Sequence, residues 1–217
     1  MKNKYLPTYY EPKEEKLNVI THAIGLFLSI IALIVLVIKA SIYGTVWHVV
    51  SFSIYGVSLI VLYTASTLYH KSKELKIKTK LNIFDHASIY ILIAGTYTPF
   101  TLVTLNGKTG WWVFGVTWFM AVTGVILKLF FTGKYDKLST IMYVLMGWIM
   151  AIVIKPLIHS LPISGVYWLF AGGISYTLGA VLYSIEKLKY NHAIFHLFVL
   201  AGSFCHFISV YFYVLKV

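Results

Sequence analysis

The 217-residue sequence contains no arginine and few charged residues of either sign. Charged side chains make up 12% of the chain and hydrophobic ones 59%, whereas soluble domains carry about 25% charged residues. This composition excludes an ordinary soluble protein and predicts a protein that resides in a lipid bilayer. Because Cys205 is the only cysteine, no intrachain disulfide can form. We interpret it as a small apolar residue, with a thiolate ligand as the less favoured alternative.

Seven apolar segments are long enough to cross the bilayer. A helix needs about 20 apolar residues to span a hydrocarbon core of roughly 30 Å, and backbone groups in that core must pair within their own segment. We therefore expect an all-α, polytopic membrane protein with a single domain over residues 1–217 and no attached soluble domain. Residues 1–16 form a polar segment rather than a cleavable signal peptide. The predicted spans are residues 19–38, 45–69, 81–105, 111–131, 139–157, 165–185 and 193–215.

Lysines are concentrated on one side of this seven-span topology. Thirteen of the 18 fall in the N-terminal segment and in the loops on the same side. Positive residues collect in cytoplasmic loops, so we expect the N-terminus in the cytoplasm and the C-terminus outside. The lysine run over residues 71–80 is interpreted as a solvated loop. A nucleic-acid partner is not expected despite the net charge of +11, because membrane orientation and anionic lipid headgroups account for these lysines.

Polar and ionisable residues cluster at the predicted cytoplasmic ends of four spans. Such residues are costly in a membrane and mark candidate functional sites. His192 and His196, four residues apart, lie on one face of a helix and can bind a single metal ion if a third ligand comes from another helix. The other members of the cluster are Glu15, Asn18, His22, Ser66, His70, Asp85 and His86.

Five residues of this cluster also have a structural interpretation. His70 can stabilise the C-terminus of its helix, and Asp85 can cap the N-terminus of the third span. Glu15 and Asn18 can cap the first span, and Ser66 can hydrogen-bond to its own helix backbone. The shared membrane level of all these residues favours a common functional site over a set of unrelated structural roles.

Three motifs in the cluster resemble the signature of the hemolysin III and progestin/adipoQ receptor superfamily. They are Glu15-x-x-Asn18-x-x-x-His22, Ser66-x-x-x-His70 followed by Asp85, and His192-x-x-x-His196, in the order of that superfamily. The segment from Gly95 to Pro99 is similar to its glycine and proline break. The resemblance covers nearly the whole chain and is greatest to the bacterial hemolysin III branch, which implies a multi-pass protein of the bacterial plasma membrane.

The resemblance also implies a zinc site. The ligands would be His70, His192 and His196. Asp85 would lie close to the metal and act in catalysis with Ser66, while His22, Asn18 and Glu15 would lie behind the ligands or on the substrate side. His86, beside Asp85, leaves open a competing ligand.

Three protein ligands leave a fourth position for water, as in catalytic zinc sites. The resulting hypothesis is ceramidase-like hydrolysis of a lipid amide or ester, with a long-chain acyl lipid of the membrane as substrate. Iron, cobalt and nickel would also fit the ligand types.

Three other functions stay open at this point. The protein can be a receptor-like regulator of membrane state with a structural zinc ion, a cytolysin that permeabilises target cells, or a proton- or ion-coupled transporter. Seven long apolar spans argue against a secreted cytolysin, because they suit permanent residence in the host membrane. No span carries an acidic residue near its middle, which argues against a transporter.

Overall fold

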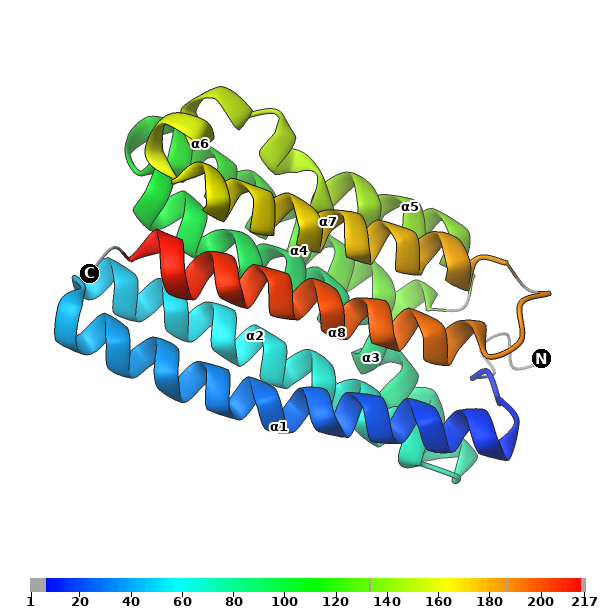
Figure 1. The fold of residues 1–217 in the computed structure, drawn as a ribbon. Helices are drawn as coiled ribbons and strands as arrows, with labels where there is room; N and C mark the ends of the chain where they lie inside the picture. The colour runs from blue at the N-terminus through cyan, green and yellow to red at the C-terminus, as the bar shows by residue number, and fades with distance from the viewer. Residues whose placement is uncertain (1–6, 133, 186, 216–217) are drawn as a thin grey trace.

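The computed structural model describes residues 7–132, 134–185 and 187–215, which form a bundle of helices (Figure 1). Residues 1–6 of the predicted polar segment lie outside this description, as does Lys216, so the lysines among them are not tested by it. No strand occurs in the described residues. The all-α prediction is therefore confirmed.

Within residues 7–132, 134–185 and 187–215, eight α-helices form the bundle, and most of them cross it from end to end. Among the described residues, six helices are long and apolar enough to span a membrane, and the bent pair α5 and α6 gives a seventh if it counts as one span. The first helix begins and the last one ends at opposite ends of the bundle (Figure 1), as an odd number of crossings requires. The helices are α1 (Pro12–Tyr43), α2 (Val46–Lys71), α3 (Leu75–Pro99), α4 (Gly107–Phe131), α5 (Asp136–Gly147), α6 (Ile154–Ser160), α7 (Ile163–Tyr183) and α8 (Asn191–Ser209).

The fifth span differs from its prediction as one continuous helix over residues 139–157. Helix α5 ends at Gly147, a short 3₁₀ turn follows at Ile149–Ala151, and α6 leaves at an angle of 55°. Pro156 accounts for the break, because it has no backbone N–H and its ring clashes with the carbonyl four residues earlier. Pro156 itself stands in the first turn of α6, where a missing backbone N–H leaves no intrahelical hydrogen bond unmade.

The third span is longer than predicted and begins six residues earlier than expected. Helix α3 starts at Leu75, so the connection from α2 consists of residues 72–74 only. The interpretation of residues 71–80 as a solvated loop is therefore wrong. At its other end α3 continues past Pro99 into a π-helix at Phe100–Leu105, so the segment from Gly95 to Pro99 does not end the span. A second π-helix, Val210–Val214, extends α8.

The helices form a ring around an internal cavity. Helix α1 packs against α2 and α8, α2 packs against α3, and α7 packs against α8, while α5 contacts α3 and α7 and so completes the ring. Helix α4 packs on the outside of α3. Glycines allow the closest contacts: a Cβ atom on Gly25 of α1 would lie 2.4 Å from the ring of Tyr63 on α2. Small residues at such positions are typical of membrane helix pairs, since they let the helices approach closely.

Candidate metal site and its cavity

Three histidines from two helices meet at one end of the bundle. His70 is in the last turn of α2, and His192 and His196 are in the first two turns of α8. Each offers a ligand atom, and these atoms all lie within 4.8 Å of one another. The exposed fractions of the three residues are 4%, 6% and 1%, so the group is shielded from solvent. The Nε2 atoms of His70 and His192 are only 3.0 Å apart.

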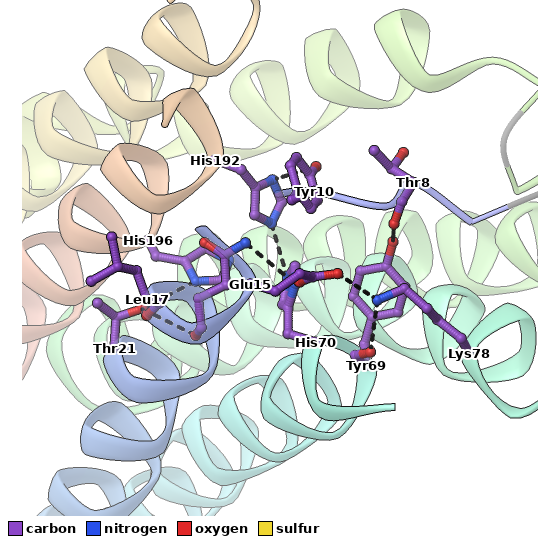
Figure 2. Close-up of polar contacts among 11 residues, drawn as sticks. Thr8, Tyr10, Glu15, Leu17, Thr21, Tyr69, His70, Lys78, His192 and His196 are labelled. Atoms are coloured by element: carbon purple, nitrogen blue, oxygen red, sulfur yellow. Dashed lines mark hydrogen bonds and ion pairs between the residues drawn. The ribbon is translucent and has the colours of Figure 1, made fainter. Parts of the chain in front are cut away.

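The outward-facing nitrogen of each of these histidines has its own hydrogen-bond partner (Figure 2). The Nδ1 atom of His70 is 2.6 Å from a carboxylate oxygen of Glu15. The Nδ1 atom of His196 is 3.2 Å from the Thr21 hydroxyl, and that of His192 is 2.9 Å from the Tyr10 hydroxyl. Metal-binding histidines generally donate their second ring N–H to such partners, which orients the ring and fixes its tautomer.

Two of these partners determine where the imidazole proton resides. The Glu15 carboxylate can only accept, so His70 carries its proton on Nδ1. The Thr21 hydroxyl donates to the backbone carbonyl of Leu17, which leaves its oxygen to accept the Nδ1 proton of His196. Both rings then present an Nε2 lone pair, which is the form that binds metals.

Tyr10 holds the third histidine from the segment that precedes α1. Its ring stacks on His192 with the centroids 4.6 Å apart. Burial raises the pKa of the Tyr10 hydroxyl, so this group stays neutral and able both to donate and to accept. The neighbouring carbonyl of Thr8 accepts a hydrogen bond from the Tyr69 hydroxyl at 3.1 Å. The segment thus covers the histidines from their exposed end.

A buried lysine holds the Glu15 side chain in place. Lys78 on α3 is 1% exposed, and its Nζ atom lies 2.7 Å from the second carboxylate oxygen of Glu15. The ammonium group also lies over the Tyr69 ring, 4.5 Å from the centroid. Sequence reasoning missed Lys78 because it placed this residue in a loop. The missed signal is its spacing: Lys78, Asn82 and Asp85 stand at i, i+4 and i+7 and are all buried on one face of α3.

The remaining residues of the first motif lie around the histidines. His22 stacks on His196 with the ring centroids 3.4 Å apart, and neither of its ring nitrogens has a hydrogen-bond partner among the described residues. The amide nitrogen of Asn18 is 3.4 Å from His70 Nδ1. Neither Glu15 nor Asn18 caps α1, which begins at Pro12 and has no side-chain cap.

Asp85 and Ser66 line a cavity that adjoins the histidines. The cavity measures about 150 Å³, and its wall includes His22, His192 and His196. Asp85 lies ten residues inside α3, so it is not a cap of this helix. Ser66 is 1% exposed, and its hydroxyl makes no hydrogen bond within the described part of the chain. Its predicted bond to its own helix is therefore not seen.

The three-histidine arrangement fits a divalent metal ion. Two Nε2 atoms at 3.0 Å need a shared proton or a shared cation between them, and imidazoles held at Nδ1 by a carboxylate and hydroxyls are typical of zinc sites. Within the described residues, these three histidines are the only group of at least three histidine, cysteine or acidic side chains that could hold an ion. His86 and Cys205 are not part of it.

Comparison with known proteins gives concordant matches over nearly the full length. A family described as "Haemolysin-III related" matches residues 10–207. "Hemolysin-3" of Bacillus cereus is 51% identical, with 94% of this chain and 93% of that protein covered. "Hemolysin-3 homolog" of Bacillus subtilis is 48% identical over 94% of this chain and 96% of its own. "Monocyte to macrophage differentiation factor" of Homo sapiens is 28% identical, with coverage of 98% and 88%.

Proposed function

The chain belongs to the haemolysin-III-related family of multi-pass membrane proteins, and on that premise we propose that it is a zinc-dependent hydrolase of a lipid amide or ester. One observation carries the proposal: three buried imidazoles meet beside a cavity that also contains a carboxylate and an unpartnered hydroxyl. A structural zinc site is closed by four protein ligands, whereas a catalytic site keeps one position open. Three histidines therefore support a catalytic role.

Zinc is the metal that this ligand set supports best, since imidazole ligands suit it. His70, His192 and His196 would hold it, with Glu15, Thr21 and Tyr10 orienting their rings. A bound zinc ion supplies Lewis acidity and lowers the pKa of water to about 7, which is the chemistry that amide and ester hydrolysis needs at neutral pH.

The chain's own groups would handle the proton and the carbonyl oxygen. Asp85 lines the cavity and would accept the proton of the attacking water, then pass it to the leaving amine or alkoxide. Ser66 would donate its hydroxyl proton to the developing oxyanion. Its lack of any other partner among the described residues leaves it available for this role.

The cavity supports a substrate with an acyl chain. Its wall continues from Asp85 along α3 through Ile89, Leu92 and Ile93, and an apolar wall of this kind favours an apolar chain. The residues that line it from α5 and α7, such as Tyr143 and Thr177, are half-buried. The segment around Tyr10 covers the histidines from the other direction. A lipid would therefore arrive from the membrane, past α5 and α7.

Purified wild-type protein in lipid vesicles tests this proposal beside Asp85→Asn. We would measure zinc by elemental analysis and turnover with a panel of fluorescent acyl amides and esters. We expect about one zinc ion per chain in both proteins and a turnover in Asp85→Asn lower by roughly 10²–10⁴-fold. Glu74→Gln, which makes the same acid-to-amide change at an exposed position, should behave as wild type.

Other outcomes would favour the competing functions. Zinc that is bound while no substrate of the panel is consumed would favour a receptor-like regulator. The printed names of the two Bacillus relatives refer to haemolysis. Leakage of lipid vesicles caused by low doses of purified protein would favour a cytolysin and would contradict the hydrolase.

A further inference from the structure

The cavity extends well beyond the three-histidine site. On α8 its wall runs from His196 to His206, ten residues and therefore about 15 Å at the helical rise of 1.5 Å per residue. On α3 it runs in the same direction from Asp85 to Thr96 and Tyr97. Apolar residues such as Ile93 and Val199 lie between the two ends. The cavity is thus polar at the histidine site, apolar in its middle and polar again at its far end.

Most polar groups at the far end are already satisfied. The Trp148 indole donates to the Thr177 hydroxyl at 3.0 Å, and Thr177 donates to the carbonyl of Gly173 at 2.8 Å. The Tyr97 hydroxyl bonds to the carbonyl of Gly147, and that of Tyr176 bonds to Ser203. Two groups of the far wall remain: Nδ1 of His206 and Oγ1 of Thr96 have no hydrogen-bond partner in the described part of the chain.

One ring nitrogen of His206 is paired and the other is an acceptor that receives no hydrogen bond within the described residues. Its Nε2–H donates to the backbone carbonyl of Leu169 on α7 at 3.0 Å, so Nδ1 carries the lone pair. Gly172 makes room for the ring, because a Cβ atom there would lie 2.2 Å from His206. The residue is only 5% exposed. A buried acceptor without a donor is costly, and a ligand that supplies an O–H removes that cost.

Thr96 differs from Thr98 and Thr101, the next two threonines of the same span. Thr98 donates to the carbonyl of Ala94 at 2.8 Å, and Thr101 donates to that of Tyr97 at 3.0 Å. Such bonds to the carbonyl four residues earlier are the usual way for a threonine in a membrane helix to satisfy its hydroxyl. Thr96 is 3% exposed and makes no such bond. Its hydroxyl is therefore free to donate to a ligand oxygen.

We propose that His206 and Thr96 form a far pocket that binds a hydroxyl group on the acyl chain of the ligand, about 15 Å from the three-histidine site. The ligand hydroxyl donates to His206 Nδ1, and its oxygen accepts the hydrogen bond from Thr96. This pocket deepens the proposed hydrolase function and rests on it for the bond that is cleaved. It assigns the substrate class as a hydroxylated acyl lipid rather than a plain acyl lipid.

Binding of two free fatty acids of equal length tests the far pocket without any hydrolysis. We would measure the affinities of laurate and ω-hydroxylaurate for the purified holoprotein in detergent, by displacement of a fluorescent fatty acid. Wild type should bind ω-hydroxylaurate roughly 2- to 10-fold more tightly, the worth of a typical hydrogen bond. The preference should disappear in His206→Phe and in Thr96→Val, which keeps the shape of threonine and removes its hydroxyl.

The control is His159→Phe, which changes an exposed histidine of α6 outside the cavity and should keep the preference. Equal affinity of wild type for the two chains would overturn the far pocket, and this would be the result if an ordered water satisfied both groups. That outcome leaves the hydrolase proposal intact. Binding of neither chain would contradict the far pocket and the acyl-lipid substrate together.

Discussion

The helices on the two sides of the cavity differ in how tightly they are held. On one side, α2 and α8 carry the three histidines, and α1 joins both helices through the contacts of Gly25, Glu15 and Thr21. On the other side, α5 and α6 form a broken span, and the cavity residues of α5 and α7 are half-buried. The difference indicates a division of roles. The first side fixes ligand geometry, and the second leaves room for a lipid.

The largest expected effect is a loss of zinc binding when a histidine is removed at one end of α8 but not at the other. His192→Ala removes a ligand and should abolish stoichiometric zinc binding, a greater loss than the roughly 10–100-fold that removal of an outer partner causes. His206→Ala, at the far end of the same helix, should bind zinc as wild type does. Elemental analysis of the purified proteins measures both. Retention of zinc in His192→Ala would remove this residue from the ligand set.

Lys78, the buried lysine of α3, tests whether a residue outside the ligand set helps to fix the ligand geometry. Lys78→Met leaves Glu15 without its cation, so Glu15 should hold His70 less well and zinc affinity should fall by about 10–100-fold. Lys76→Met removes an exposed lysine of the same helix and should change nothing. Competition with a chelator of known affinity gives both constants. Equal affinities in the two variants would mean that Lys78 is structural only.

Paired glycine substitutions compare the packing of α1 against α2 and α8 with the packing of α7 around Trp148. Gly25→Ala places a Cβ atom 2.4 Å from Tyr63 and 2.9 Å from Leu200, and overpacking of this kind costs about 1–3 kcal/mol of stability. Gly173→Ala, on α7, meets nothing closer than Trp148 at 4.0 Å and should be nearly neutral. Thermal unfolding in one detergent compares them. If both variants melt at the same temperature, these two contacts do not differ in packing.

The smallest expected effect concerns the cover over the histidines. Tyr10→Phe keeps the ring stacked on His192 and removes only the hydroxyl, so zinc affinity should fall by roughly 2- to 10-fold, the worth of one hydrogen bond. Tyr9→Phe makes the same change at a residue that is 57% exposed and serves as its control. A chelator competition resolves a difference of this size. An unchanged affinity in Tyr10→Phe would show that the hydroxyl does not orient His192.

Much of the fold could be predicted because membrane helices are determined locally. An apolar stretch of sufficient length must form a helix in hydrocarbon, whatever its neighbours are. The errors fall where a second signal competes with hydropathy. Pro156 breaks the fifth span within a stretch that hydropathy predicts as one helix, and the lysines of residues 71–80 concealed the first two turns of α3.

The sequence by itself determined the class of protein, the helices and the residues that stand at one membrane level, because these depend on composition and spacing along a single chain. Tertiary structure decided which of those residues meet. It brought Tyr10, Thr21 and Lys78 to the histidines and left His86 outside the group. It also created the cavity, whose far end holds the unsatisfied groups of Thr96 and His206. Contacts between segments far apart in the chain depend on how helices pack, and no local pattern encodes that packing.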